Sequence, residues 1–246
     1  MLKLMKYELR KTWFSKLMVL IVTGIAEVLF LSGIFGKNES LTTGGTALLV
    51  MISMFGIICV GLHSLLVLNK DLNTKQGYMI FMTPRSSYQI LGAKIVENGL
   101  STLLASLFFL GLAWIDITLA IREFGIKTNL IELIQEFLNE LPVKVEFSFG
   151  GISVVFLGFV ISWFATVVTA AFAIILSSTL LTGRRLNILM SLVIFFAISF
   201  AINFLSERIP YFDHYGYYLI RSLVELAIAA AIFLISSWIM EKKLSV

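Results

Sequence analysis

Residues 46–68 read TALLVMISMFGIICVGLHSLLVL, an apolar run without Asp, Glu, Lys or Arg. A helix needs roughly 20 mainly apolar residues to cross the hydrocarbon core of a bilayer, so this run predicts a membrane-spanning helix. The next residues, 69–88, read NKDLNTKQGYMIFMTPRSSY and are too polar to cross. Another long apolar run begins at about residue 95. The chain therefore places a positively charged, amphipathic interruption between two predicted spans.

Six windows of the chain are long and apolar enough to cross a bilayer: about 17–35, 46–68, 95–120, 150–180, 187–205 and 217–240. Residues of the set AVILMFWYC make up 59% of the chain, and charged residues make up 14%. A soluble domain is nearer half apolar and a quarter charged, so the composition excludes a soluble protein. We predict an all-α membrane protein with six transmembrane helices, forming a single transmembrane domain over residues 1–246.

The first window is predicted to be a retained helix rather than a cleavable signal peptide. It carries Glu27 and has no small-x-small cleavage site before Lys37. The single cysteine, Cys59, lies in an apolar run, which excludes a disulfide within the chain.

Basic residues predict the orientation of the spans. The positive-inside rule places segments rich in Lys and Arg on the cytoplasmic side. With both termini inside, the inner segments hold Lys3, Lys6, Arg10, Lys11, Lys16, Lys70, Lys75, Arg85, Lys94, Arg184, Arg185, Lys242 and Lys243, and the outer ones hold only Lys37, Arg122, Lys127, Lys144 and Arg208. We therefore expect a multi-pass protein of a bacterial-type plasma membrane with both termini in the cytoplasm.

Two further segments are amphipathic. Residues 1–16, MLKLMKYELRKTWFSK, set an apolar stripe beside a basic one, which is typical of a helix lying in the inner membrane interface. The alternative is a basic flank that only orients the first span. Residues 128–141, TNLIELIQEFLNEL, predict an external amphipathic helix with an acidic face, which Pro142 ends. We expect it to cap the external mouth or to pack on a second subunit, and a solvated surface helix is the alternative.

No motif for catalysis or nucleotide binding occurs in the sequence. There is no G-x-x-x-x-G-K-[ST] loop, no Gly-rich dinucleotide turn, no cysteine-based metal site and no G-x-S-x-G motif. His63 and His214 fall on opposite sides of the membrane in the predicted topology, which argues against a two-histidine metal centre. The chain is predicted to be no enzyme by itself, to bind no cofactor or metal, and to have no nucleic-acid partner.

The order of these parts resembles the permease subunits of ABC-2-type ATP-binding-cassette exporters. The resemblance covers the whole chain by topology: a basic amphipathic N-terminus, two spans, a helical cytoplasmic loop and four further spans. By motif it rests on Gly77-Tyr78-Met79-Ile80-Phe81-Met82-Thr83-Pro84-Arg85-Ser86, then Ile90-Leu91-Gly92-Ala93-Lys94, and on the opening Leu4-Met5-Lys6-Tyr7-Glu8-Leu9-Arg10-Lys11.

The resemblance implies a cytoplasmic coupling helix at about 70–82, within the segment 69–88, which we name the coupling segment. This helix would dock in a groove on a separate ABC ATPase subunit, and ATP and Mg²⁺ would be bound by that ATPase. The chain would work in membrane lipid as a dimer with a second copy or a sister permease. An exporter is implied, and an apolar lining favours an amphiphilic or peptide-like substrate.

The residue types of the coupling segment suit a docking surface. Tyr78, Phe81 and Met82 are anchors of the kind that dominate protein interfaces. Lys75 and Arg85 are positioned to meet acidic groups on the rim of a partner, or lipid headgroups. The alternative is an interfacial loop that merely obeys the positive-inside rule.

The end of the coupling segment predicts a rigid corner. Thr83 can cap the next helix, with Pro84 in its first turn, which would fix the angle at which the third span leaves the segment. A rigid corner transmits displacement, whereas a slack loop does not.

Charged side chains inside spans are costly in lipid, by roughly 2.5–3.5 kcal/mol on insertion scales, so they face protein or water. Arg221 and Glu225 stand four apart on one helix, which predicts a local ion pair. Glu97 near the inner edge and Asp116 near the outer edge are expected at the limits of the apolar core. Glu27 sits mid-span without a partner nearby in sequence. We expect Glu27, and also Glu97, to line a polar path or a subunit interface.

Two other functions stay open from the sequence. An ion-coupled secondary transporter would use Glu27, Glu97 or Glu225, although the chain shows no internal repeat and no paired broken helices. A non-transporting membrane scaffold or sensor subunit is the other alternative.

Overall fold

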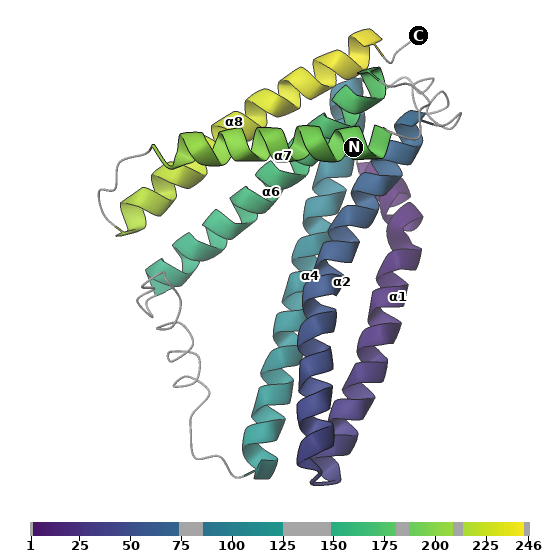
Figure 1. Cartoon of the computed structure of the whole chain (residues 1–246), viewed down its shortest axis with the longest axis vertical. Helices are drawn as coiled ribbons and strands as arrows, with labels where there is room; N and C mark the ends of the chain where they lie inside the picture. The colour runs from purple at the N-terminus through teal and green to yellow at the C-terminus, as the bar shows by residue number, and fades with distance from the viewer. Residues whose placement is uncertain (1, 74–85, 125–148, 181–186, 209–213, 244–246) are drawn as a thin grey trace. The chain divides into compact units, whose positions relative to one another are not determined.

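A computed structural model describes residues 2–73, 86–124, 149–180, 187–208 and 214–243. Its regular secondary structure within these ranges is entirely helical, in six helices: α1 (Leu2–Phe35), α2 (Glu39–Asn73), α4 (Ser87–Phe124), α6 (Phe149–Leu180), α7 (Asn187–Ser206) and α8 (His214–Lys243) (Figure 1). All six are long and apolar enough to cross a membrane. They confirm the prediction of an all-α chain with six membrane-suited helices, and they indicate a multi-pass membrane protein.

Each predicted span lies inside one of these helices, and most of the helices are considerably longer than a bilayer needs. α1, α2 and α4 have 34, 35 and 38 residues, against roughly 20 for one crossing. The additional turns at the C-terminal end of α2 and the N-terminal end of α4 reach the described limits of the coupling segment. Polar residues at these ends can therefore be helical and packed without lying in lipid.

The chain divides into two compact units. Unit 1 comprises residues 1–12, 61–100 and 153–246, and unit 2 comprises residues 13–60 and 101–152. The helices α1, α2, α4 and α6 contribute residues to both units, whereas α7 and α8 belong entirely to unit 1.

In unit 2, α1 and α2 form a hairpin with a short turn. The backbone N–H of Lys37 donates to the Ile34 carbonyl at 3.1 Å, and that of Asn38 donates to the Gly33 carbonyl at 3.0 Å. This pattern ends α1 as a Schellman motif, with Lys37 in the left-handed region at φ 49°. The Asn38 side chain then caps α2 by accepting from the Ser40 N–H at 3.1 Å.

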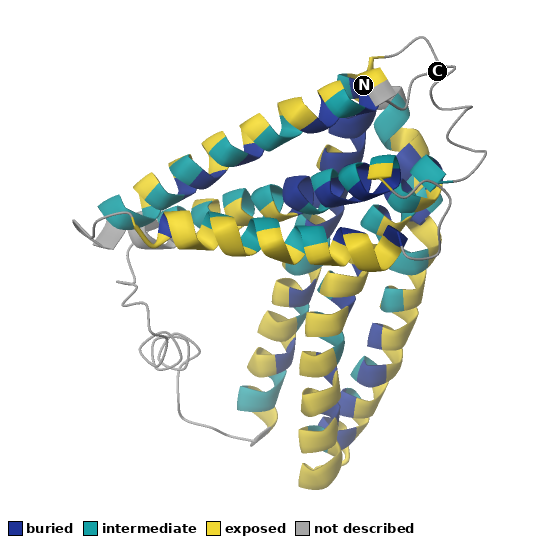
Figure 2. Cartoon of the chain, turned by 45° about the horizontal axis from the view of Figure 1, so that its top comes forward, coloured by how far each residue is buried: buried dark blue, intermediate teal, exposed yellow. Residues whose placement is uncertain are grey.

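The core of unit 2 is an apolar seam between α1, α2 and α4. Ala26, Phe30 and Ile34 of α1 and Leu49 of α2 are buried, and Leu112, Leu119 and Ala120 of α4 pack against them. Figure 2 shows buried residues along the faces that these helices turn toward one another and exposed residues on their other faces. The exposed side chains are largely apolar, as suits helices surrounded by lipid.

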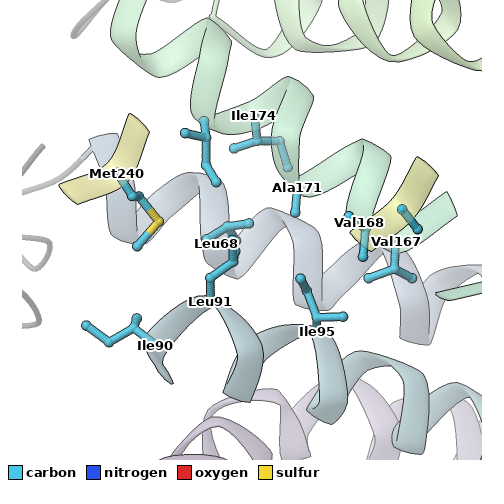
Figure 3. Close-up of a cluster of buried hydrophobic side chains, with 11 residues drawn as sticks. Leu68, Ile90, Leu91, Ile95, Val167, Val168, Ala171, Ile174 and Met240 are labelled. Atoms are coloured by element: carbon cyan, nitrogen blue, oxygen red, sulfur yellow. The ribbon is translucent and has the colours of Figure 1, made fainter. Parts of the chain in front are cut away.

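The core of unit 1 joins the C-terminal end of α2 and the N-terminal end of α4 to α6 and α8. Figure 3 shows Leu68 of α2 and Leu91 of α4 pointing toward a cluster that includes Ala171 of α6, with Met240 of α8 at one side. Leu91 is completely buried. Apolar packing therefore holds the helical flanks of the coupling segment.

The predicted surface segments have different outcomes. Residues 2–16 are helical, and α1 continues through them into the first span without a break. Whether they lie on the membrane surface stays a prediction. The predicted external helix 128–141 lies outside the described residues.

The prediction for the start of the third span needs a correction. α4 begins at Ser87, and the Ser86 carbonyl accepts from the backbone N–H groups of Gln89 at 2.9 Å and Ile90 at 3.2 Å. Ser86 therefore occupies the N-cap position of α4, and serine is among the preferred residues there. Thr83 and Pro84, which were predicted to fill the cap and first turn, lie outside the described residues.

Candidate functional site

The predicted docking residues Lys75, Tyr78, Phe81, Met82, Pro84 and Arg85 all lie outside the described residues. The structure does describe both flanks of the coupling segment, which are the last turns of α2 and the first turns of α4. The candidate functional site is therefore built from these flanks and from the helices that they contact.

A buried ionic cluster in unit 1 joins the two flanks to α1. The Lys94 Nζ atom of α4 lies 2.6 Å from Asp71 Oδ2 of α2 and 2.9 Å from Glu8 Oε2 of α1. Lys11 of α1 donates to the other carboxylate oxygen of Asp71. We name Glu8, Lys11, Asp71 and Lys94 the ionic cluster.

Burial makes the geometry of the ionic cluster demanding. Asp71 is 1% exposed and Lys94 is 6% exposed, so each charge has lost nearly all its contact with solvent. Desolvation costs several kcal/mol per ion, and only close, well-aligned partners offset it. Asp71 also lies in the last turn of α2, where the helix dipole disfavours an acid. The ammonium groups of Lys11 and Lys94 therefore fix the position of the C-terminal end of α2.

Glu97 lies deeper in unit 1, next to the ionic cluster. It is 1% exposed and accepts from the Thr12 hydroxyl of α1 and the Ser64 hydroxyl of α2, each at 2.8 Å. The expectation that Glu97 lies at the limit of the apolar core needs refinement, because the residue is enclosed by protein. Its carboxylate cross-links the same three helices as the ionic cluster.

An uncharged contact ties the first flank of the coupling segment to α7. The Asn187 Nδ2 group, at the start of α7, donates to Asn73 Oδ1, at the end of α2, at 2.7 Å. The Ser177 hydroxyl of α6 donates to the Asn187 carbonyl at 2.7 Å. We name Asn73, Ser177 and Asn187 the amide contact. A movement of the last turn of α2 would therefore displace α7 and, through the Ser177–Asn187 contact, α6.

A small cavity lies beside the ionic cluster, with a volume of about 10 Å³. It is lined by Ser64, Leu65, Leu68, Lys94, Ile95, Asn98, Val167 and Ala171. A space of this size is at the lower limit for one water molecule. The cavity is therefore too small for a substrate, and the ionic cluster is better suited to holding helices together than to binding cargo.

A pair of carboxyl groups lies within unit 2. The carboxyl groups of Glu27 on α1 and Asp116 on α4 lie within hydrogen-bonding reach of each other. One oxygen of each group, Glu27 Oε2 and Asp116 Oδ1, is buried, and no described residue gives it a hydrogen bond. Asp116 is 6% exposed and is therefore enclosed by protein, whereas its position near the outer edge of the span stays a prediction. Glu27 does have a partner, on a helix remote in sequence.

The predicted ion pair on α8 is present. Arg221 Nε donates to Glu225 Oε1 at 3.1 Å. The second carboxylate oxygen of Glu225 accepts from the Ser162 hydroxyl of α6. This pair balances its own charge and attaches α8 to α6, as a structural contact within unit 1.

Sequence reasoning did not single out Glu8, Asp71, Asn73 and Asn187, and it named Lys94 only as an inner basic residue and as the last residue of the motif that carries the resemblance. One signal was present, since Glu8 is the only acidic residue within the otherwise basic segment 1–16. An acid that stands alone among basic residues at the inner membrane surface is a candidate for a buried pair. The other members depend on which helices meet, and spacing along the chain does not encode this.

Comparisons of the chain with protein-family models, curated proteins and solved structures gave no match. Among the residues that the structure describes, no group of three or more His, Cys, Asp or Glu side chains could hold a metal ion.

Proposed function

We propose that this chain is the permease subunit of an ABC transporter of the ABC-2 type, driven by separate ATPase subunits that dock on the coupling segment. The supporting observation is the buried ionic contact between Asp71 and Lys94, at 2.6 Å, between the two flanks of that segment. A segment whose ends are fixed to each other moves as one body. A partner that pushes on it would then displace helices rather than bend a loop.

Within unit 1, the contacts around the Asp71–Lys94 pair would transmit such a displacement to other helices. Glu8 and Lys11 join this pair to α1, and the amide contact joins the end of α2 to α6 and α7. The chain itself carries no phosphate-binding loop, so in this proposal the energy of ATP enters through the partner. The complex would contain two permeases in a bacterial-type plasma membrane, with the coupling segment in the cytoplasm. The cargo would be an amphiphilic or peptide-like molecule that is exported.

Affinity purification tests the docking. The tagged chain, extracted from native membranes in mild detergent, is expected to bring down an ATPase with a P-loop. The variant Y78D/F81D should lose this ATPase, because a carboxylate in an apolar groove must be desolvated without a partner. The matched variant Y78F/F81L keeps the apolar surface and should retain the ATPase.

Two results would overturn the docking proposal. One is the absence of any P-loop ATPase with the unchanged chain. The other is retention of the ATPase by Y78D/F81D when size-exclusion chromatography shows that the variant is folded. Transport that persists in vanadate and follows a proton gradient would instead favour the ion-coupled alternative.

A further inference from the structure

The contact between Glu27 and Asp116 requires a proton. Two ionised carboxylates have only acceptor atoms, so neither can donate to the other. The carboxyl groups of Glu27 and Asp116 lie within reach of each other, and a hydrogen bond between them therefore forms only when the pair holds one proton. Two carboxyl groups in direct contact, sharing a single proton, form a recurrent arrangement in sites that bind and release protons.

The described segments of α1, α2 and α4 around the pair contain no basic side chain. On α1, no titratable side chain lies between Lys16 and Lys37 apart from Glu27 itself, and on α4 none lies between Glu97 and Arg122 apart from Asp116. From α2 the seam receives Leu49 and Ile52, and the sequence 40–58 contains no titratable residue. No basic side chain in these described segments can therefore offset the negative charge of the pair, and a proton bound to the pair is what reduces it.

The unpaired atoms of the pair are a second, independent observation. Asp116 is 6% exposed, and thus 94% buried, and its Oδ1 atom has no hydrogen-bond donor among the described residues. Glu27 Oε2 is also buried and has no hydrogen-bond donor among the described residues. Buried polar atoms are normally hydrogen-bonded, and exceptions deserve a functional explanation. These two oxygens can accept or carry a proton without any rearrangement of the helices.

We propose that Glu27 and Asp116 form a proton-binding site within the membrane-spanning part of unit 2, in which one proton is held between the two carboxyl groups. The ligand is a proton rather than a metal cation, because hard cations take about six or more oxygen ligands and the described residues contain no group of three or more His, Cys, Asp or Glu side chains that could hold a metal ion. The proposal does not depend on an ATPase partner. It can therefore fail or stand separately from the proposed function.

Infrared spectroscopy of the full chain in lipid nanodiscs tests the site. A protonated carboxyl group has a carbonyl stretch that an ionised carboxylate lacks, and this band shifts in D₂O. We expect the unchanged chain to show the band at neutral pH. The double variant E27Q/D116N replaces both acids by amides of the same shape and should abolish the band.

The matched control is E225Q, which also removes an intramembrane acid. Glu225 accepts from Arg221 Nε at 3.1 Å and has no contact with a second carboxyl group in the described structure, so this variant should leave the band unchanged. The proposal is overturned if the unchanged chain lacks the band, or if the band survives in a folded E27Q/D116N variant.

A titration with sodium chloride at constant pH and constant ionic strength, with choline chloride as the balancing salt, checks the nature of the ligand. A proton site predicts that the band keeps its intensity as Na⁺ replaces choline. Loss of the band with rising Na⁺ would show that the metal ion displaces the proton, and would overturn the assignment of a proton-specific site. This measurement uses the unchanged chain and does not depend on the folding of any variant.

Discussion

Lys94 stands between two buried carboxylates, so its removal tests whether the ionic cluster holds unit 1 together. The substitution K94M keeps much of the side-chain volume but leaves Glu8 and Asp71 without their shared partner. We expect the free energy of unfolding to fall by about 3–5 kcal/mol, the usual cost of breaking a buried pair from one side. An SDS titration followed by circular dichroism measures it.

Two further variants separate this effect from a general loss of charge. The exposed residue Lys242 provides the control K242M, which should change stability by less than about 0.5 kcal/mol. The quadruple variant E8Q/K11M/D71N/K94M removes all four charges of the ionic cluster and should recover most of the loss. Equal stability of K94M and the unchanged chain would show that the cluster contributes nothing to the packing.

The residue scale shows where sequence reasoning succeeds and where it stops. The pair Arg221–Glu225 was predictable because both residues lie on one helix at a spacing that forces contact. The contact between Asp71 and Lys94 joins two helices across a separation of 23 residues. Such contacts depend on the rotation and pairing of helices, which the sequence of each helix leaves undetermined. For this reason Glu27 was predicted without its partner Asp116.

At the scale of elements, the approach of α1 and α2 depends on a glycine. A Cβ atom added at Gly45 would lie 2.7 Å from Phe30 Cα and 2.9 Å from Phe30 N, both backbone atoms that cannot rotate away. We expect G45A to lower the free energy of unfolding by about 1–3 kcal/mol through overpacking. The neighbouring variant G44A meets nothing within 4 Å and should be neutral or stabilising by up to about 1 kcal/mol.

The comparison of these two variants isolates packing from helix propensity, since both replace a glycine by alanine in the same turn of α2. An SDS titration of the two proteins side by side is the measurement. If G45A proves as stable as G44A, the close approach at Phe30 is absent in the membrane.

Element positions were more predictable than element ends. Apolar length alone located six helices, because the hydrocarbon core imposes the same requirement on each span. The ends depend on polar residues outside this core, where packing and capping compete. Ser86 rather than Thr83 caps α4, and α2 continues to Asn73 because its last turns are packed in unit 1. Hydropathy contains no information on either point.

At the scale of the whole molecule, the orientation in the membrane is the prediction to test. In a C59A background, the variant K37C should react with a membrane-impermeant maleimide in intact cells. The variant K242C should react only after the cells are permeabilised. Both lysines are exposed, and the distribution of basic residues predicts opposite sides for them.

Counting labelled protein by mass spectrometry gives the result for each variant. Labelling of K242C in intact cells would place the C-terminal end of α8 outside. The coupling segment would then face away from any cytoplasmic ATPase, and the proposed function would fail with it.

The turn between α1 and α2 has a consequence for how the protein is made. Only Gly36, Lys37 and Asn38 separate the two helices, and their backbone groups serve to close one helix and begin the next. So short a connection cannot remain at one surface while the second helix waits to enter the bilayer. We therefore expect α1 and α2 to enter the membrane together, as a single hairpin.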